Sequence, residues 1–182
     1  IAEAVADVRE FALQPGTRFT TRCGGLFLFL PDLVRLRLEE LASRAKLPGS
    51  RMIPASHALR CALALKLWSI ERKSHVMDLV FDPGLAVFAG LNVIPKRSYL
   101  AAYSSKIDHQ ADLRLMAAWS TQVHAAGLPR GDSFDLDFHT VPANTQEEPL
   151  EKHYVSSRSR RQQGILVFLA RDATERVLCY GN

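Results

Sequence analysis

The sequence predicts a protein of mixed α and β structure, with a helical region followed by a group of strands. Three observations lead to this prediction. Apolar residues recur at helical spacing up to about residue 130, and beyond it they alternate or run continuously. A glycine- and proline-containing segment at 127–131 separates the two patterns. We therefore expect two domains, at residues 1–130 and 131–182.

Composition and charge exclude several classes of protein. The chain has 182 residues, 47% of them hydrophobic and 23% charged, so it is neither disordered nor collagen-like. Its three cysteines lack the spacing of a disulfide framework or a zinc site. No apolar run approaches the ~20 residues of a membrane helix, so we expect a cytoplasmic protein with no membrane segment. The net charge of +4 favours acidic partners without identifying one.

Three long helices are predicted in the first domain. The first follows Pro31, and its apolar residues Val34, Leu38, Leu41 and Ala45 share one face. The second covers residues 57–72 and is apolar on nearly every face, which is typical of a central buried helix. The third begins after a capping residue, Asp108, and ends at Gly127.

Residues 82–100 predict a short helix, a turn and a second helix that starts near Lys96. Ala86, Gly90 and Leu91 stand where a helix-turn-helix motif places a small residue, a turn glycine and an apolar plug. Lys96 stands where such a motif buries a side chain. Two interpretations therefore stay open, a DNA-reading helix-turn-helix and an ordinary helical corner.

Three strands are predicted in the second domain. Residues 134–141 alternate, so that Phe134, Leu136 and Phe138 share one face and Asp135, Asp137 and His139 share the other. Residues 164–170 and 176–180 are continuous apolar runs. The short polar residues between them, 171–175, are typical of a hairpin connection.

The acidic row on the first strand is a candidate metal site. Carboxylates on a rigid strand can hold a hard divalent cation, and Asp135 and Asp137 are the candidate ligands. Alternate residues of a strand lie ~6.6 Å apart, so at most two adjacent members of the row could approach one ion. The alternative is that the row, with His139, is the solvent face of an edge strand.

A basic segment at 152–163 is a candidate nucleic-acid contact. Its charge is +4, because it contains Lys152, Arg158, Arg160 and Arg161 and no acid. Arginine forks and hydroxyls suit phosphate contacts, whose strength falls as salt rises. The alternative is a solvated basic loop.

Several separated phrases of the sequence resemble bacterial insertion-sequence transposases of the DDE type. The downstream phrases are 136–142 (LDFHTVP) and 151–172, and the upstream phrases are 25–31, 71–76 and 88–96. The resemblance covers most of the chain from about Phe19 onward. It implies that residues 131–182 begin an RNase H-like α/β core, which is truncated here.

The resemblance also implies roles for individual residues. Asp137 is the first acid of the catalytic triad, and Asp135 is the second choice for that role. The remaining Asp and Glu would lie beyond Asn182. Asp172 and Glu175 belong to a hairpin turn and do not take these roles. The implied DNA contacts are Lys96, Arg97, Lys152, Arg158, Arg160 and Arg161.

The resemblance implies metal-dependent phosphodiester strand transfer during transposition. Two Mg²⁺ or Mn²⁺ ions would bind only in the complete active site, so we expect the 182-residue chain to be catalytically silent alone. The implied partner is double-stranded DNA at transposon ends, bound by a homo-oligomer in the bacterial nucleoid. Two other classes stay open. They are a helix-turn-helix DNA-binding protein without catalysis, and a helical interaction domain with a chance acidic strand.

Overall fold

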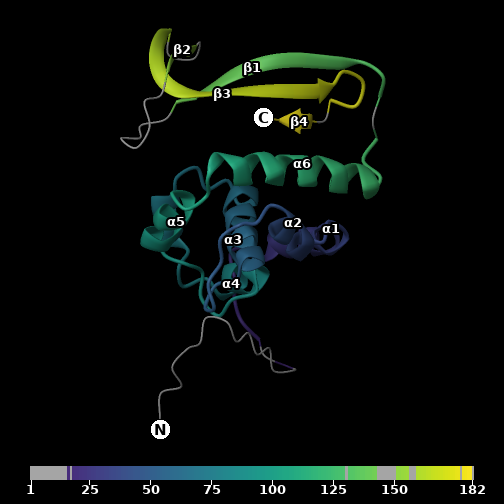
Figure 1. Cartoon of the computed structure of the whole chain (residues 1–182). Coiled ribbons are helices and arrows are strands. Elements are labelled where there is room, and N and C mark those ends of the chain that lie inside the picture. Colours follow the sequence, from purple (N-terminus) through teal and green to yellow (C-terminus); the bar gives the residue numbers. More distant parts are fainter. Residues whose placement is uncertain are drawn as a thin grey trace. The chain divides into compact units, whose positions relative to one another are not determined.

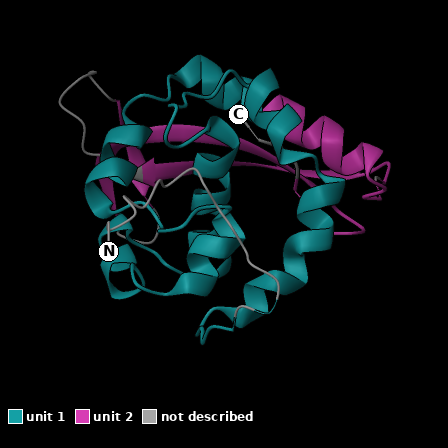
Figure 2. Cartoon of the chain, turned by 90° about the horizontal axis from the view of Figure 1, so that it is seen from below, with its two compact units in different colours: residues 1–115 teal, residues 116–182 magenta. Residues whose placement is uncertain are grey.

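The computed structural model describes residues 16, 18–129, 131–142, 151–155, 159–176 and 178–181. These residues form helices followed by antiparallel strands, which confirms the predicted mixed class (Figure 1). The chain divides into two compact units, residues 1–115 and 116–182 (Figure 2). No helix in the described part of the chain is long and apolar enough to cross a membrane.

The helices of the first unit are mostly short. They are η1 (Gly24–Phe29), α1 (Leu30–Arg35), α2 (Leu38–Arg44), α3 (Ala55–Leu67), η2 (Lys73–Asp78), α4 (Pro83–Ala89), α5 (Arg97–Ser104) and the start of α6 (His109–Ala125), where η marks a 3-10 helix. Helix α3 packs against α2 and α4, and η1 packs against α1 and α4. The core between them is apolar and includes the fully buried side chains of Leu26, Leu41, Cys61 and Phe88.

The predicted helix after Pro31 is broken into α1 and α2. Arg37 adopts a left-handed conformation with φ +48°, which interrupts the helix and shifts its phase. Leu38 and Leu41 are buried as predicted, but Val34 is 76% exposed and Leu33 is buried in its place. The predicted single apolar stripe is therefore wrong in its first turn.

The predicted helix at 57–72 is shorter and less buried than its composition indicates. Helix α3 ends at Leu67, and Ser69 then adopts a positive φ of 58°. Only the face that carries Ala58, Cys61, Ala64 and Leu65 is buried. The rest of α3 is partly or fully exposed, because only a few short elements are available to cover it.

The helical corner at 82–100 has a longer connection than a helix-turn-helix motif. Helix α4 ends at Ala89 and α5 begins at Arg97, so the connection runs from residue 90 to residue 96. A helix-turn-helix uses three or four residues there. Lys96 is exposed, and Leu91 and Ile94 are buried in the core instead.

Helix α6 crosses the division between the two units. Asp108 caps it as predicted, since its carboxylate accepts a hydrogen bond of 2.6 Å from the Ala111 amide. Ala111 and Leu115 pack against Ala42 and Leu47. These contacts assign the first turns of α6 to unit 1, so the division falls earlier than the predicted boundary after residue 130.

The second unit contains an antiparallel sheet built on one long strand. Its strands are β1 (Phe134–Pro142), β2 (Lys152–Val155), β3 (Arg160–Asp172) and β4 (Leu178–Gly181). Strand β3 pairs with each of the other three (Figure 1). The alternating strand and the hairpin after it are confirmed. The basic segment at 152–163, predicted without strands, contains β2 and the start of β3.

Asp82 ties the segment before η1 to the start of α4. Its carboxylate accepts hydrogen bonds from the Gly84 and Leu85 amides, from the Thr21 hydroxyl at 2.5 Å and from the Arg22 amide at 2.8 Å. Burial acts to raise the pKa of Asp82, but these hydrogen bonds together hold it below its ordinary value. The ionised carboxylate is therefore the form that the fold stabilises.

This connection leaves no room for a side chain at Gly84. A Cβ atom there would lie 2.2 Å from the Thr21 hydroxyl oxygen, which Asp82 holds in place. We expect Gly84→Ala to lower the free energy of unfolding by about 1–3 kcal/mol, measured by urea denaturation. Gly25→Ala is the matched control, because no atom lies within 4 Å of its added Cβ. Equal stability of the two variants would contradict this packing.

Candidate nucleic-acid interface

The register of β1 and β3 determines which residues share a face of the sheet. Asp135 lies opposite Arg171, Asp137 opposite Leu169 and His139 opposite Val167. Directly paired residues of antiparallel strands lie on the same face. We call this the polar face of the sheet. It contains the predicted metal ligands, and it is continuous along the odd-numbered residues of β3.

The two candidate acids on this face differ in their surroundings. Asp135 accepts a hydrogen bond of 2.9 Å from the guanidinium of Arg171, and both side chains are about half exposed. Asp137 lies opposite an apolar residue, Leu169, and is exposed. Asp137 is therefore the carboxylate of the pair that is held by no cation in the described structure, whereas a metal at Asp135 would compete with Arg171.

The polar face extends into the hairpin formed by β2 and the start of β3. Tyr154 lies opposite Arg161, and Lys152 lies opposite Gln163. Residues 161 and 163 have the same parity as residues 167, 169 and 171 of β3, so strand alternation puts this end and the acids on one face. The sequence placed Tyr154 and Gln163 in the basic segment but did not show that they share a face with the acids, because the four residues of β2 are too few to establish a period. Arg171 was predicted only as part of the hairpin connection, and its place beside Asp135 follows from the register of β1 and β3.

The predicted basic residues are divided between the two faces of the hairpin. Lys152 and Arg161 are exposed on the polar face. Arg160 lies opposite Val155, whose parity places both on the other face. Arg158 lies outside the described residues. The predicted phosphate contacts therefore do not form a single cluster in the described part of the hairpin.

Gly164 joins the hairpin to the part of β3 that pairs with β1. It lies opposite Pro142, and a Cβ atom at this position would lie 2.6 Å from the carbonyl oxygen of Val141. Glycine inside a strand often marks such a close backbone approach. Any larger residue would push β3 away from β1 at the point where the acidic part of the polar face gives way to the basic part.

Lys96 and Arg97 are exposed at the beginning of α5 in unit 1. The sequence placed them among the DNA contacts, and their exposure leaves them accessible to a phosphate. They belong to a different compact unit from the polar face.

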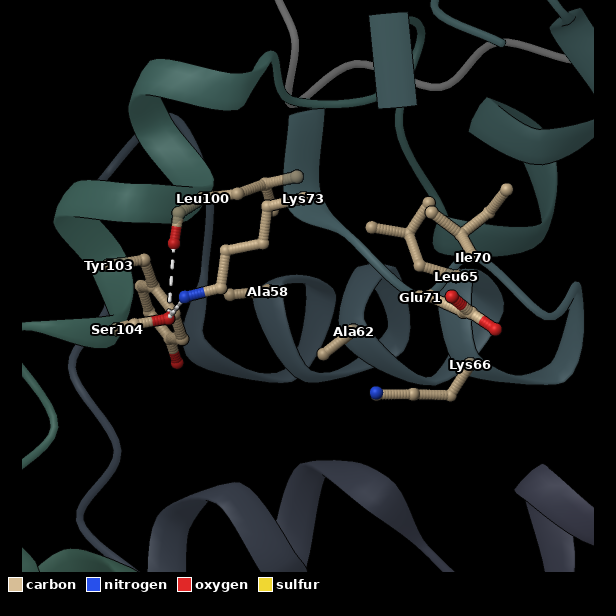
Figure 3. A pocket seen from close by; sticks show the side chains of 10 residues that line it. All are labelled: Ala58, Ala62, Leu65, Lys66, Ile70, Glu71, Lys73, Leu100, Tyr103 and Ser104. Carbon is tan, nitrogen blue, oxygen red and sulfur yellow. Dashed lines mark hydrogen bonds between the residues drawn. The ribbon is translucent and has the colours of Figure 1, made fainter. Parts of the chain in front are cut away.

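Unit 1 also contains a pocket that includes none of the predicted site residues (Figure 3). The cavity measures about 170 Å³, with an apolar wall from α3 and α5 and with Lys66, Glu71 and Lys73 among its lining residues. Lys73 donates a hydrogen bond to the Ser104 hydroxyl, which donates in turn to the Leu100 carbonyl at 3.2 Å. The pocket is too small for most ligands of drug size.

No group of three or more His, Cys, Asp and Glu side chains in the described ranges could hold a metal ion. The acidic row thus supplies one or two oxygen ligands, and a complete site needs ligands from elsewhere. Comparisons of the chain with protein-family models, curated proteins and solved structures find no match.

Asp172 anchors the far end of β3. Its side chain is fully buried. The carboxylate accepts hydrogen bonds from the Thr174 and Glu175 amides at 2.9 and 2.7 Å and from the Gly131 amide. The amides of Glu175 and Gly131 hold the pKa of Asp172 below its ordinary value, against the opposing effect of burial. This supports its structural role in the turn.

These hydrogen bonds predict how the stability of the sheet depends on pH. The pKa of Asp172 is lower in the folded state than its ordinary value of 3.8. Its contribution to the free energy of unfolding is therefore complete above pH 3.8 and is lost as pH falls through the folded-state pKa. We expect the stability difference between wild type and Asp172→Asn to shrink below pH 3.8, as measured by urea unfolding with near-ultraviolet detection. Asp132→Asn is the control, because Asp132 is an exposed carboxylate near the same turn. A difference that does not vary with pH would contradict the assignment.

Proposed function

We propose that this chain is the DNA-binding and first-acid portion of a transposase of the DDE type, with an RNase H-like core. One observation carries the proposal. A single face of the sheet bears an uncompensated carboxylate, Asp137, at one end and the exposed basic residues Lys152 and Arg161 at the other. Phosphodiester chemistry on DNA needs both features, because acids hold the metal and cations hold the backbone.

Asp137 offers one of the oxygen ligands that a hard divalent cation takes. Mg²⁺ or Mn²⁺, when bound, would polarise the reacting phosphate and lower the pKa of water. Asp137 would hold the ion from a rigid strand, where its carboxylate is exposed and faces no cation. Asp135, held by Arg171, would stay in place as the neighbouring charge. In this proposal, the other acids of the triad are supplied from outside these 182 residues.

The separation of the two ends fits a short DNA segment. A strand rises ~3.3 Å per residue, so Arg161 and Leu169, the partner of Asp137, lie up to ~26 Å apart along β3. A duplex rises ~3.4 Å per base pair. The basic end would thus hold the backbone about seven or eight base pairs from the phosphate at Asp137.

The alternative is a helix-turn-helix DNA-binding protein without catalysis. Its support is the exposure of Lys96 and Arg97 at the start of α5. The long connection between α4 and α5 does not match the short turn of that motif. We therefore assign Lys96 and Arg97 to backbone contacts of the transposase.

Metal binding tests the role of Asp137. The two ions of the complete site need its other acids, but weak, rapidly exchanging contact of one paramagnetic Mn²⁺ with Asp137 is enough to broaden amide NMR signals. We expect this broadening around residues 136–138 of the full chain. Asp137→Asn should abolish this broadening, and Asp135→Asn should leave most of it, because Arg171 already occupies Asp135. Broadening that is lost in Asp135→Asn and kept in Asp137→Asn would contradict the assignment.

Salt dependence tests the phosphate contacts. Each phosphate contact adds about 0.9 to the slope of log affinity against log salt. Replacing both Lys152 and Arg161 with alanine should therefore reduce the slope for duplex DNA by about 1.8, measured by fluorescence anisotropy. Lys106, an exposed lysine of unit 1, provides the control substitution. An unchanged slope in the double variant would show that these residues touch no phosphate.

A further inference from the structure

Tyr154 is a large aromatic side chain left exposed on a strand. It is 60% exposed, although it lies within a paired hairpin rather than in a loop. Its direct cross-strand neighbour is Arg161, and Lys152 lies two residues away on the same face. The ring therefore has a basic side chain opposite it and another beside it along its own strand.

The other face of the hairpin explains why the ring points outward. The neighbouring residue Val155 is 6% exposed and points to the opposite face. Burial of this apolar side chain fixes the register, because a slip of one residue would expose Val155 and turn Tyr154 inward. The exposed tyrosine is thus held by packing on the reverse side.

An exposed aromatic ring beside two cations suits a single strand of DNA better than a duplex. In duplex DNA the base faces are stacked on one another, and a protein ring on a flat strand reaches only the backbone and the groove edges. In a single strand the faces of the bases are free, and they stack on aromatic side chains while cations track the phosphates. A duplex interface would use Lys152 and Arg161 but would gain little from the face of Tyr154.

We infer that this hairpin binds unpaired DNA, with one base stacked on Tyr154 and the adjacent phosphates paired with Lys152 and Arg161. The inference rests on the proposed function and specifies the form of its substrate. A transposon end whose strands have separated would present such a segment at the hairpin, up to ~26 Å along β3 from Leu169, the partner of Asp137. Lys152 and Arg161 would hold the backbone of either form, and only the single strand would add a base stacked on Tyr154.

The test compares two forms of one DNA sequence. Fluorescence anisotropy of the full chain is measured with a labelled single-stranded oligonucleotide and with the same oligonucleotide annealed to its complement. Stacking of one base contributes enough that Tyr154→Ala should weaken single-strand binding by about 5- to 150-fold. Affinity for the duplex should change less than about twofold. Tyr154→Phe keeps the ring and should bind the single strand as wild type does.

Three controls separate stacking from general effects. Phe81 is 93% exposed and lies in the other unit. Phe81→Ala removes an exposed ring outside the hairpin, and this variant should bind the single-stranded oligonucleotide as wild type does. Circular dichroism of each variant checks that the sheet is intact. Tyr154→Phe also controls for loss of the fold, since it retains the volume of the side chain.

Each result has a defined meaning. Equal weakening of single-strand and duplex binding by Tyr154→Ala, or no weakening of either, would overturn the inference while leaving phosphate binding in place. A chain that binds duplex DNA but no single strand would also overturn it. A chain that binds neither form would overturn the DNA-binding part of the proposed function as well. Manganese binding at Asp137 remains an independent measure of the metal site.

Discussion

The pairing of β3 with its three neighbours is the constraint on which the candidate site depends. Register assigns each side chain of β1 and β2 to a face, so a slip of one residue would move Asp137 to the opposite face from Arg161. Such a slip would leave every residue in place along the sequence and still separate the acid from the cation. The chemistry proposed for this sheet therefore requires this one register of its hydrogen-bonded strands.

Two features hold that ladder, one at an end and one in the middle. At one end the buried Asp172 fixes the turn between β3 and β4 through backbone amides. In the middle, Gly164 allows β3 to approach the backbone of β1 closely. Asp172 and Gly164 are even-numbered residues of β3, so they lie on the face opposite the polar face. Both nevertheless determine where the residues of the polar face lie. The cross-strand pair of Asp135 and Arg171 adds a modest contribution, since both side chains are about half exposed.

The sequence predicted the mixed fold, the alternating strand and the hairpin, because a period of two over eight residues is a strong local signal. It did not predict β2, whose four residues are too few to establish a period. The break at Arg37 was also missed, because it involves no glycine or proline. For the site, the alternation placed Asp135 and Asp137 on one face. The contribution of Arg171 required the register between strands, which depends on contacts distant in the chain.

The hydrogen bonds between Thr21, Arg22 and Asp82 have a consequence for the limits of unit 1. The first helical element begins at Gly24, yet these bonds lie before it and satisfy the carboxylate that caps α4. A protease that trims the chain to its first helix would remove partners from a group near the core. The boundary of this unit therefore lies at or before Thr21, and it is defined by polar contacts rather than by secondary structure.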